Sequence, residues 1–325
     1  MKNLLFTSTL FLIVNFSFAQ TKIENDLSRD GLKGKVSFYS ESKYELGEKF
    51  GEIEKGSLRS KDTYKFNEKG NKIESISYKA DGSLLSKSTS KYDVKGNMIE
   101  VSVYNADGSL ENKDTYKYDE KGNKIEHKYN IGVVGIFWRE TYKYDVKGNM
   151  IEWNSYNADG SLNSKIKYKY DEKENKIEQN FYNADGSLSS KNTYKYDEKG
   201  NKIEENRYTT WSGLGCSNAT GYKSSGDKQD ADGSLESKIT NKYDDKGNMI
   251  EKNYYNADGS LYSKYTSKYD EKGNKIEYNE YNADGSLESK RTYKYEFDAT
   301  GNWIKKTSIT DGKSEKLIER VIEYY

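Results

Sequence analysis

Hydrophobic and polar residues alternate in short stretches along most of this chain, and glycine-bearing tetrapeptides separate the stretches. In residues 110–118 the apolar positions Leu110, Tyr116 and Tyr118 share one parity, while Lys113 and Thr115 take the other. A period of two is what a pleated strand requires, and Tyr and Thr favour strands. A helix is a poor alternative, because a glycine-bearing turn interrupts every stretch. The pattern therefore predicts short β-strands.

The stretches belong to a repeat whose turns recur at a fixed interval. A Gly-Asn step, with Glu174 once in place of Gly, recurs every 26 residues from Gly70 to Gly200 and again from Gly247 to Gly273. Each period carries two turn tetrapeptides, of the types Asp-Glu-Lys-Gly and Asn-Ala-Asp-Gly, typical of a type I turn followed by a left-handed glycine. The predicted turn glycines are Gly70, Gly96, Gly108, Gly122, Gly148, Gly160, Gly186, Gly200, Gly247, Gly259, Gly273 and Gly285. Two hairpin turns per period make two strands per period.

The fold class that follows is all-β, an antiparallel array of hairpins. Two strands per period predict about 18 strands in residues 56–325. Because an open twisted sheet seldom exceeds about 10 strands without curling, we expect a curled or spiralling single sheet, with a flat sheet as the alternative. Residues 20–55 and 297–325 depart from the period, and we expect them to be caps that end the stack.

Turn geometry also predicts which side chains share a face. The Asn-Ala-Asp-Gly turn pairs Tyr104 with Leu110, and an uninterrupted register then places Met98 opposite Tyr116. We therefore expect Tyr104, Leu110, Tyr116 and Tyr118 to project to one common side, the inner one. The opposite side would carry a narrow Ile and Thr stripe bordered by Lys and Glu. Those charges suit a solvated surface, with a track for a polyanion as the alternative.

The first 19 residues resemble a targeting segment. Lys2 precedes an apolar run from Leu4 to Phe18, and Ser17-Phe18-Ala19 approximates the small-x-small pattern before a cleavage site. The run is shorter than the roughly 20 residues that span a bilayer, which favours a cleaved signal peptide over a membrane anchor. We expect an exported protein, periplasmic, at the cell surface or secreted, without a transmembrane segment after cleavage.

Composition limits the possible chemistry. The 53 basic and 53 acidic residues balance, so there is no general attraction to nucleic acid or anionic lipid. His127 and Cys216 are the only histidine and cysteine, so no internal disulfide, zinc cluster or His-based acid or base pair is expected. The Asn-Ala-Asp-Gly turns lack the distal Glu of a calcium loop. We predict no metal and no cofactor. We also predict no enzymatic activity, because the carboxylate pairs are copied in every unit.

The repeats resemble the YD repeats of the recombination-hotspot (Rhs) and teneurin-like families. The resemblance rests on the string Tyr-x-Tyr-Asp-x-x-Gly-Asn, as at 116–123 and 194–201, and on the second Asp-Gly turn, as at Asp107-Gly108. In that family such hairpins form a spiralling sheet that can close into a shell around a cargo domain. The resemblance implies a short exported version of this sheet without a toxin domain.

Function in a repeat protein is best sought where the copies differ. One Asn-Ala-Asp-Gly-Ser-Leu turn is replaced at 131–138, and another is enlarged by a loop insertion at 209–230. The candidate ligand-binding residues in these segments are Trp138, Tyr208, Trp211 and Tyr222, whose rings could stack on a sugar or peptide. The alternative is a tolerated insertion and one degenerate repeat.

These observations favour an exported, non-enzymatic β-repeat scaffold that mediates interactions at the cell envelope or exterior, with an unknown protein or glycan partner. The first alternative is a carbohydrate-binding protein of the cell-wall or glycan-binding type. A glycan-processing enzyme that uses a carboxylate pair near the insertion is a weaker one.

Overall fold

The structure, a computed structural model, describes residues 25–49, 52–131, 136–209 and 233–325. It holds one short helix, α1 (Asp26–Arg29), and a single sheet of 20 strands. The strands are β1 (Val36–Lys49), β2 (Glu52–Phe66), β3 (Lys72–Lys79), β4 (Leu84–Tyr92), β5 (Met98–Asn105), β6 (Leu110–Tyr118), β7 (Lys124–Ile131), β8 (Ile136–Tyr144), β9 (Met150–Tyr156), β10 (Leu162–Tyr170), β11 (Lys176–Asn183), β12 (Leu188–Tyr196), β13 (Lys202–Thr209), β14 (Ser234–Tyr243), β15 (Met249–Asn256), β16 (Leu261–Tyr269), β17 (Lys275–Tyr281), β18 (Leu287–Phe297), β19 (Trp303–Thr310) and β20 (Lys313–Tyr324).

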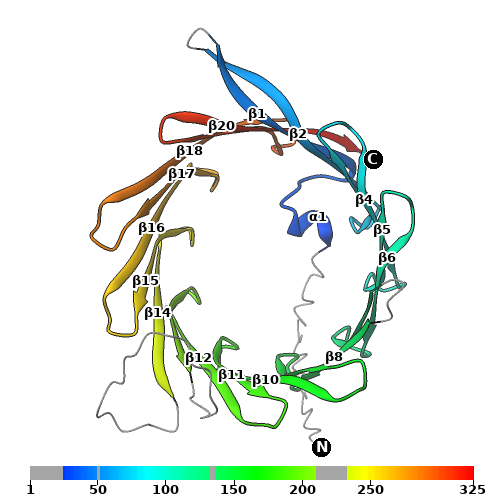
Figure 1. Cartoon of the computed structure of the whole chain (residues 1–325), viewed down its shortest axis with the longest axis vertical. Coiled ribbons are helices and arrows are strands. Elements are labelled where there is room, and N and C mark those ends of the chain that lie inside the picture. The colour runs from blue at the N-terminus through cyan, green and yellow to red at the C-terminus, as the bar shows by residue number, and fades with distance from the viewer. Residues whose placement is uncertain (1–24, 50–51, 132–135, 210–232) are drawn as a thin grey trace, which may run out of the picture.

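The sheet closes on itself. Each strand pairs antiparallel with the next, and β1 also pairs with β20, from Val36 opposite Tyr324 to Glu45 opposite Lys316. Figure 1 shows the resulting ring, from which the far part of the β1–β2 hairpin projects. The all-β hairpin array is confirmed, whereas both the curled or spiralling open sheet and the flat sheet are wrong.

The two segments expected to be caps form the closing seam. Residues 36–49 supply β1, which precedes the region predicted to hold about 18 strands, and residues 303–324 supply β19 and β20 within it; the described sheet has 20 strands. An exposed edge strand leaves a row of unpaired backbone N–H and C=O groups. Pairing β1 with β20 satisfies both rows at once, which is the physical reason why these segments do not end the stack as separate caps.

The turns have the predicted geometry. In the turn after β6, the Gly122 amide donates to the Asp119 carbonyl oxygen at 3.1 Å and the Asp119 amide donates to the Asn123 carbonyl oxygen at 2.9 Å. All of the predicted turn glycines have a positive φ, between 78° and 96°. Neighbouring turns of this type are joined along one rim, for example by the Lys95 ammonium, which donates to the Glu120 carbonyl oxygen at 3.1 Å.

Glu174 adopts the same left-handed conformation, with φ 66°. Replacing Glu174 by Gly should therefore raise the free energy of unfolding by up to about 1 kcal/mol, because a side chain is strained there. The only ion pair lost is an exposed one with Lys147 at 3.7 Å, which contributes little. Urea denaturation of Glu174→Gly checks this, with Gly200→Glu as the reverse control. A lower midpoint for Glu174→Gly would contradict it.

One prediction about the faces is wrong, because nearly every pair of neighbouring strands contains a β-bulge. Val103 lies opposite Asn112, whereas Tyr104 lies opposite Leu110, so Glu111 is an extra residue between Leu110 and Asn112. An inserted residue reverses the parity of everything beyond it. As a result Tyr104 shares a face with Glu100, and Tyr116 points to the other side. The four residues predicted to share one face therefore divide, with Tyr104 and its partner Leu110 on one side and Tyr116 and Tyr118 on the other.

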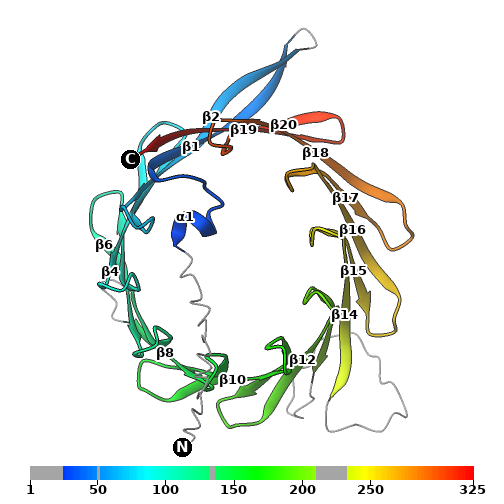
Figure 2. The same cartoon turned by 180° about the vertical axis from the view of Figure 1, so that it is seen from behind.

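Helix α1 shows which face is the inner one. It lies within the ring in both views (Figures 1 and 2). Leu27 of α1 and Leu32 form one buried cluster with Val36, Tyr39 and Phe66 of the sheet. Phe66 holds the place of Tyr118 in its copy. The face of Tyr116 and Tyr118 is therefore inner, and the face of Tyr104 and Glu100 is outer.

The outer face is a regular array of ion pairs. Glu100 contacts Lys91 at 2.9 Å and Lys113 at 2.8 Å, and seven equivalent glutamates each pair with at least one lysine. These lysines lower the pKa of Glu204, Glu251 and Glu277 to about 2. Within the described ranges, no helix has the length and apolar character needed to cross a membrane.

Candidate binding site on the inner face of the ring

The copies are nearly identical on the outer face and differ on the inner one. On the short strands, the outer position after the isoleucine is glutamate in eight copies. The next residue points inward and is different in every one of these copies. The eight inner residues are Ser75, Val101, His127, Trp153, Gln179, Glu205, Lys252 and Tyr278.

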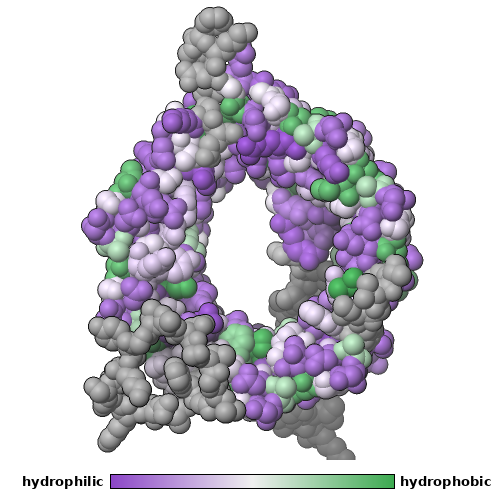
Figure 3. Space-filling view, viewed as in Figure 1, coloured by the Kyte–Doolittle hydropathy of each residue, from purple (hydrophilic) through white to green (hydrophobic). Residues whose placement is uncertain are grey.

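A second variable position on the long strands lies directly opposite the first. The partners, in the same order, are Ser88, Asp114, Glu140, Ile166, Asn192, Ile239, Tyr265 and Arg291. We call these sixteen residues the variable belt. Figure 3 shows that side chains leave an open passage through the middle of the ring, which the inner face surrounds. The belt therefore presents a different pair of side chains at each copy along one continuous surface.

The most polar part of the belt surrounds His127. Its Nε2 lies 3.1 Å from Asp114 Oδ1, its Nδ1 lies 3.2 Å from Glu140 Oε2, and its ring stacks on Tyr116 at 4.7 Å. The hydrogen bonds to the two carboxylates raise the pKa of His127, and the His127 contact lowers the pKa of Glu140 to about 2. Both ring nitrogens are engaged, and no group of His, Cys, Asp or Glu among the described residues could hold a metal ion.

The His127 contacts predict a pH-dependent contribution to stability. Because the pKa of His127 is raised on folding, the contribution is complete below its unfolded pKa of about 6.5 and is lost as pH rises through the folded pKa. His127→Gln should lower the free energy of unfolding by about 1–2 kcal/mol near pH 5.5 and by less near pH 8.5. Urea denaturation at both pH values measures the difference. Equal losses at the two pH values would contradict the assignment.

A pocket of about 500 Å³ opens on the inner face of β15–β17. Tyr265 of the belt packs edge-on against Tyr254 at 5.6 Å and stacks on Tyr278 at 5.8 Å. Lys275 lies over the Tyr278 ring at 5.2 Å, and Ser267 stands where most other copies have tyrosine. The volume and the aromatic lining with a few polar groups are typical of a ligand pocket.

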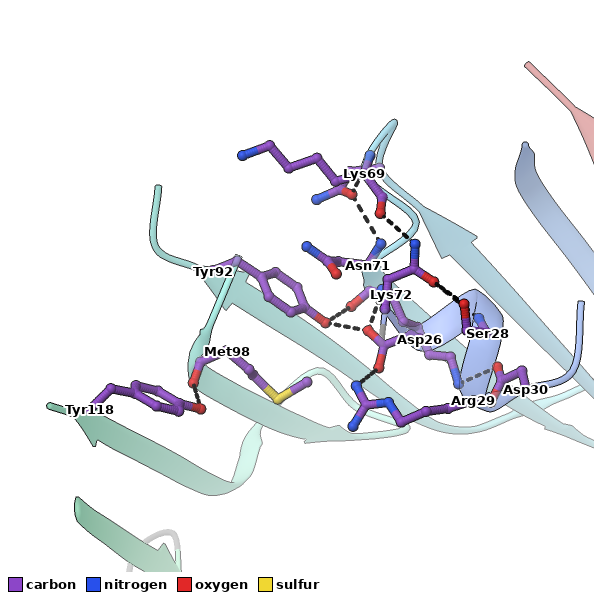
Figure 4. Close-up of polar contacts among 12 residues, drawn as sticks. Asp26, Ser28, Arg29, Asp30, Lys69, Asn71, Lys72, Tyr92, Met98 and Tyr118 are labelled. Carbon is purple, nitrogen blue, oxygen red and sulfur yellow. Dashed lines mark hydrogen bonds and ion pairs between the residues drawn. The ribbon is translucent and has the colours of Figure 1, made fainter. Parts of the chain in front are cut away.

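Helix α1 shows how the inner face can bind a peptide segment (Figure 4). Asp26 Oδ2 accepts from the Lys72 amide at 2.7 Å and lies 2.8 Å from the Tyr92 hydroxyl. The Lys72 ammonium pairs with Asp30 at 2.9 Å. The Leu27 amide donates to the Gly70 carbonyl oxygen at 3.1 Å. Two carboxylates and one leucine therefore fix this segment to a single copy of the repeat.

Lysines at the position of Lys72 recur in other copies without a helix above them. The lysines at this position are Lys124, Lys176, Lys202 and Lys275, and methionine takes the place in Met98, Met150 and Met249. Burial lowers the pKa of Lys124, Lys176 and Lys275. These partly desolvated ammonium groups lie over tyrosine rings, as Lys124 does over Tyr142 at 4.5 Å.

The candidate residues predicted from the sequence do not form one surface. Trp138 lies on the inner side of β8 and is 56 % exposed, whereas Tyr208 lies on the outer side of β13. Trp211 and Tyr222, like Cys216, lie outside the described residues. The variable belt was missed, although its signal is present in the sequence as the residue after each Ile-Glu.

No protein-family model matches the chain, and no curated protein matches its sequence. Solved structures with similar chains include TcdB2-TccC3, at 14 % identity and a TM-score of 0.33, over 84 % of this chain and 16 % of that one. They also include a porin-like protein from Bacteroides uniformis, at 13 % identity and a TM-score of 0.33, over 90 % of this chain and 98 % of that one. The chain thus spans about one-sixth of the length of TcdB2-TccC3.

Proposed function

We propose that this chain is an exported, non-enzymatic β-repeat scaffold that contacts a partner at the cell envelope or exterior through its inner face. The variable belt is the observation that carries the proposal. Copying would leave both faces uniform, and the outer face is uniform, with its Glu and Lys side chains paired to each other. The inner face instead differs at every copy, as expected of a surface that fits one particular shape and charge pattern.

The expected repertoire of the inner face is binding and not catalysis. The carboxylates of Asp114 and Glu140 are held by hydrogen bonds to His127. The tyrosines of the pocket offer large contact areas at low entropic cost. The YD-repeat resemblance, in which hairpin sheets enclose other polypeptides, agrees with a role for the interior. The apolar first 19 residues support export.

Two matched variants test the use of the inner face. Tyr265→Ser with Tyr278→Ser changes the belt to residues that the chain itself uses at Ser88 and Ser75, so the fold should tolerate them. Tyr281→Ser is the control, because Tyr281 is an outer tyrosine of β17, the strand that also carries Tyr278. Quantitative cross-linking in the native host should show loss of the main partner with the first variant and retention with the second.

The location of the protein in the cell and an assay of polysaccharide turnover complete the test. The mature chain should begin at Gln20 and be recovered outside the cytoplasm. Equal cross-linking by both variants, or a cytoplasmic location, would contradict the proposal. Turnover of a polysaccharide by the purified protein would do so as well.

A further inference from the structure

We propose that the pocket on β15–β17, together with the adjacent Tyr295 of β18, binds an acidic peptide segment of a partner protein, in the way that the copy at β2–β4 binds α1. The inference rests on the proposed inner-face binding and names its ligand chemistry. The segment would present two carboxylates on either side of an apolar residue, as Asp26, Leu27 and Asp30 do.

The polar groups that hold α1 have direct equivalents in this copy. Lys275 stands at the position of Lys72, and Tyr295 at that of Tyr92. The Tyr295 hydroxyl lies 3.0 Å from the Lys275 carbonyl oxygen, as the Tyr92 hydroxyl lies 2.7 Å from that of Lys72. The lysine and tyrosine donors therefore lie at the same place on the two strands in both copies.

In the described part of the chain, the ammonium group of Lys275 has no carboxylate partner. Lys72 is paired with Asp30, whereas burial alone accounts for the lowered pKa of Lys275, which has no carboxylate at ion-pair distance among the described residues. A second cation, Lys252, lines the same pocket, as do Glu251 and Glu280, and lies over the Tyr254 ring at 4.6 Å. A desolvated ammonium gains most from an anionic ligand.

The pocket also provides the apolar contact. At the α1 site Leu27 is 6 % exposed beside Phe66 and Tyr39. In the second copy Tyr269 replaces Phe66, and Ser267 replaces Tyr64. The smaller serine leaves the open volume between Tyr254, Tyr265 and Tyr278 that a leucine-sized side chain could fill.

One difference between the copies provides a second test. The turn beneath α1 begins with Asn67, whereas the turn beneath the pocket begins with Asp270. The Asp270 carboxylate already accepts from the Asn274 amide at 2.8 Å and from the Asn274 side chain at 2.9 Å. Its remaining negative charge opposes a second carboxylate nearby. Asp270→Asn should therefore strengthen peptide binding.

The experiment titrates the full mature chain into a fluorescently labelled peptide of residues 25–32 and follows anisotropy. Lys275→Met, which introduces the residue found at Met98, Met150 and Met249, should weaken binding about tenfold or more. Asp270→Asn should tighten binding about threefold, and the outer-face control Lys294→Met should leave it unchanged. A peptide with Asp26→Asn and Asp30→Asn should not bind.

Several results would overturn the inference. The inference is wrong if Lys275→Met leaves the measured peptide binding unchanged. That result would be seen if the peptide does not bind at all, or if it binds only by exchanging with the tethered α1. Displacement of the peptide by a neutral oligosaccharide such as cellotetraose would assign the pocket to a glycan instead. If the peptide test fails while cross-linking still depends on Tyr265 and Tyr278, the inner-face function stands and only its ligand chemistry is wrong.

Discussion

Replacing Arg320 by Ala should destabilise the protein by about 3 kcal/mol, because it removes one partner of a buried ion pair at the seam that closes the ring. Arg320 on β20 contacts Glu41 Oε2 on β1 through Nε at 3.1 Å and through a terminal nitrogen at 3.0 Å. The two side chains are 12 % and 15 % exposed. The guanidinium also lies 3.4 Å from the centre of the Trp303 ring. The variant would leave Glu41 with only Lys43, at 3.5 Å.

Urea denaturation measures this loss, and two variants make it specific to the seam. Arg59→Ala removes an exposed pair with Glu45, whose side chains are 60 % and 51 % exposed, and should cost less than about 0.5 kcal/mol. Removing both charges in Arg320→Met with Glu41→Leu should cost less than Arg320→Ala alone, since no unpaired carboxylate remains. A loss for Arg320→Ala no larger than that for Arg59→Ala would show that the seam does not depend on this pair.

The turns of this fold could be predicted from the sequence because each has its own chemical signature. A left-handed position requires glycine, and Asp119 and Asn123 bond across the turn, so spacing and residue type together identified the turns at the twelve predicted glycines. Even Glu174 was placed in the correct conformation from the period alone.

The bulges could not be predicted in the same way. The extra residue, as at Glu111, is an ordinary strand residue that needs no special φ, so nothing distinguishes it from its neighbours in the strand. A single missed bulge was enough to place Tyr104 and Tyr116 on the same face when they lie on opposite faces. The closure was missed for a related reason, because it depends on twist summed over all the strands and not on any one residue.

The positions of the variable belt could have been predicted from the sequence. The belt's two positions adjoin the constant Glu100 and the nearly constant Thr115 of each copy, so aligning the copies shows them without any coordinates. Only the structure shows that these two positions face each other across the strands on the inner side. Regular ion pairs stabilise the outer face of the sheet, and the changing side chains that carry the proposed recognition lie on the inner face.

The second large effect is expected at the only cluster of buried apolar side chains in the described residues. Phe66 is 2 % exposed beneath α1, with Leu27 and Val36 in the same cluster. Phe66→Ala should lower the free energy of unfolding by about 3–4 kcal/mol, from lost burial and the cavity left behind. Tyr170 holds the same position in a copy without a helix and is only half-buried, so Tyr170→Ala should cost about 1–2 kcal/mol.

A double-mutant cycle identifies the helix as the cause of this difference. Leu27→Ala removes the α1 side of the cluster, so Leu27→Ala combined with Phe66→Ala should cost less than the sum of the two single losses. Leu27→Ala combined with Tyr170→Ala should be additive, because the two residues belong to distant copies. Additive losses in the first pair, or equal costs for Phe66→Ala and Tyr170→Ala, would mean that α1 does not stabilise the ring. The docked segment would then be a weak precedent for peptide binding at the other copies.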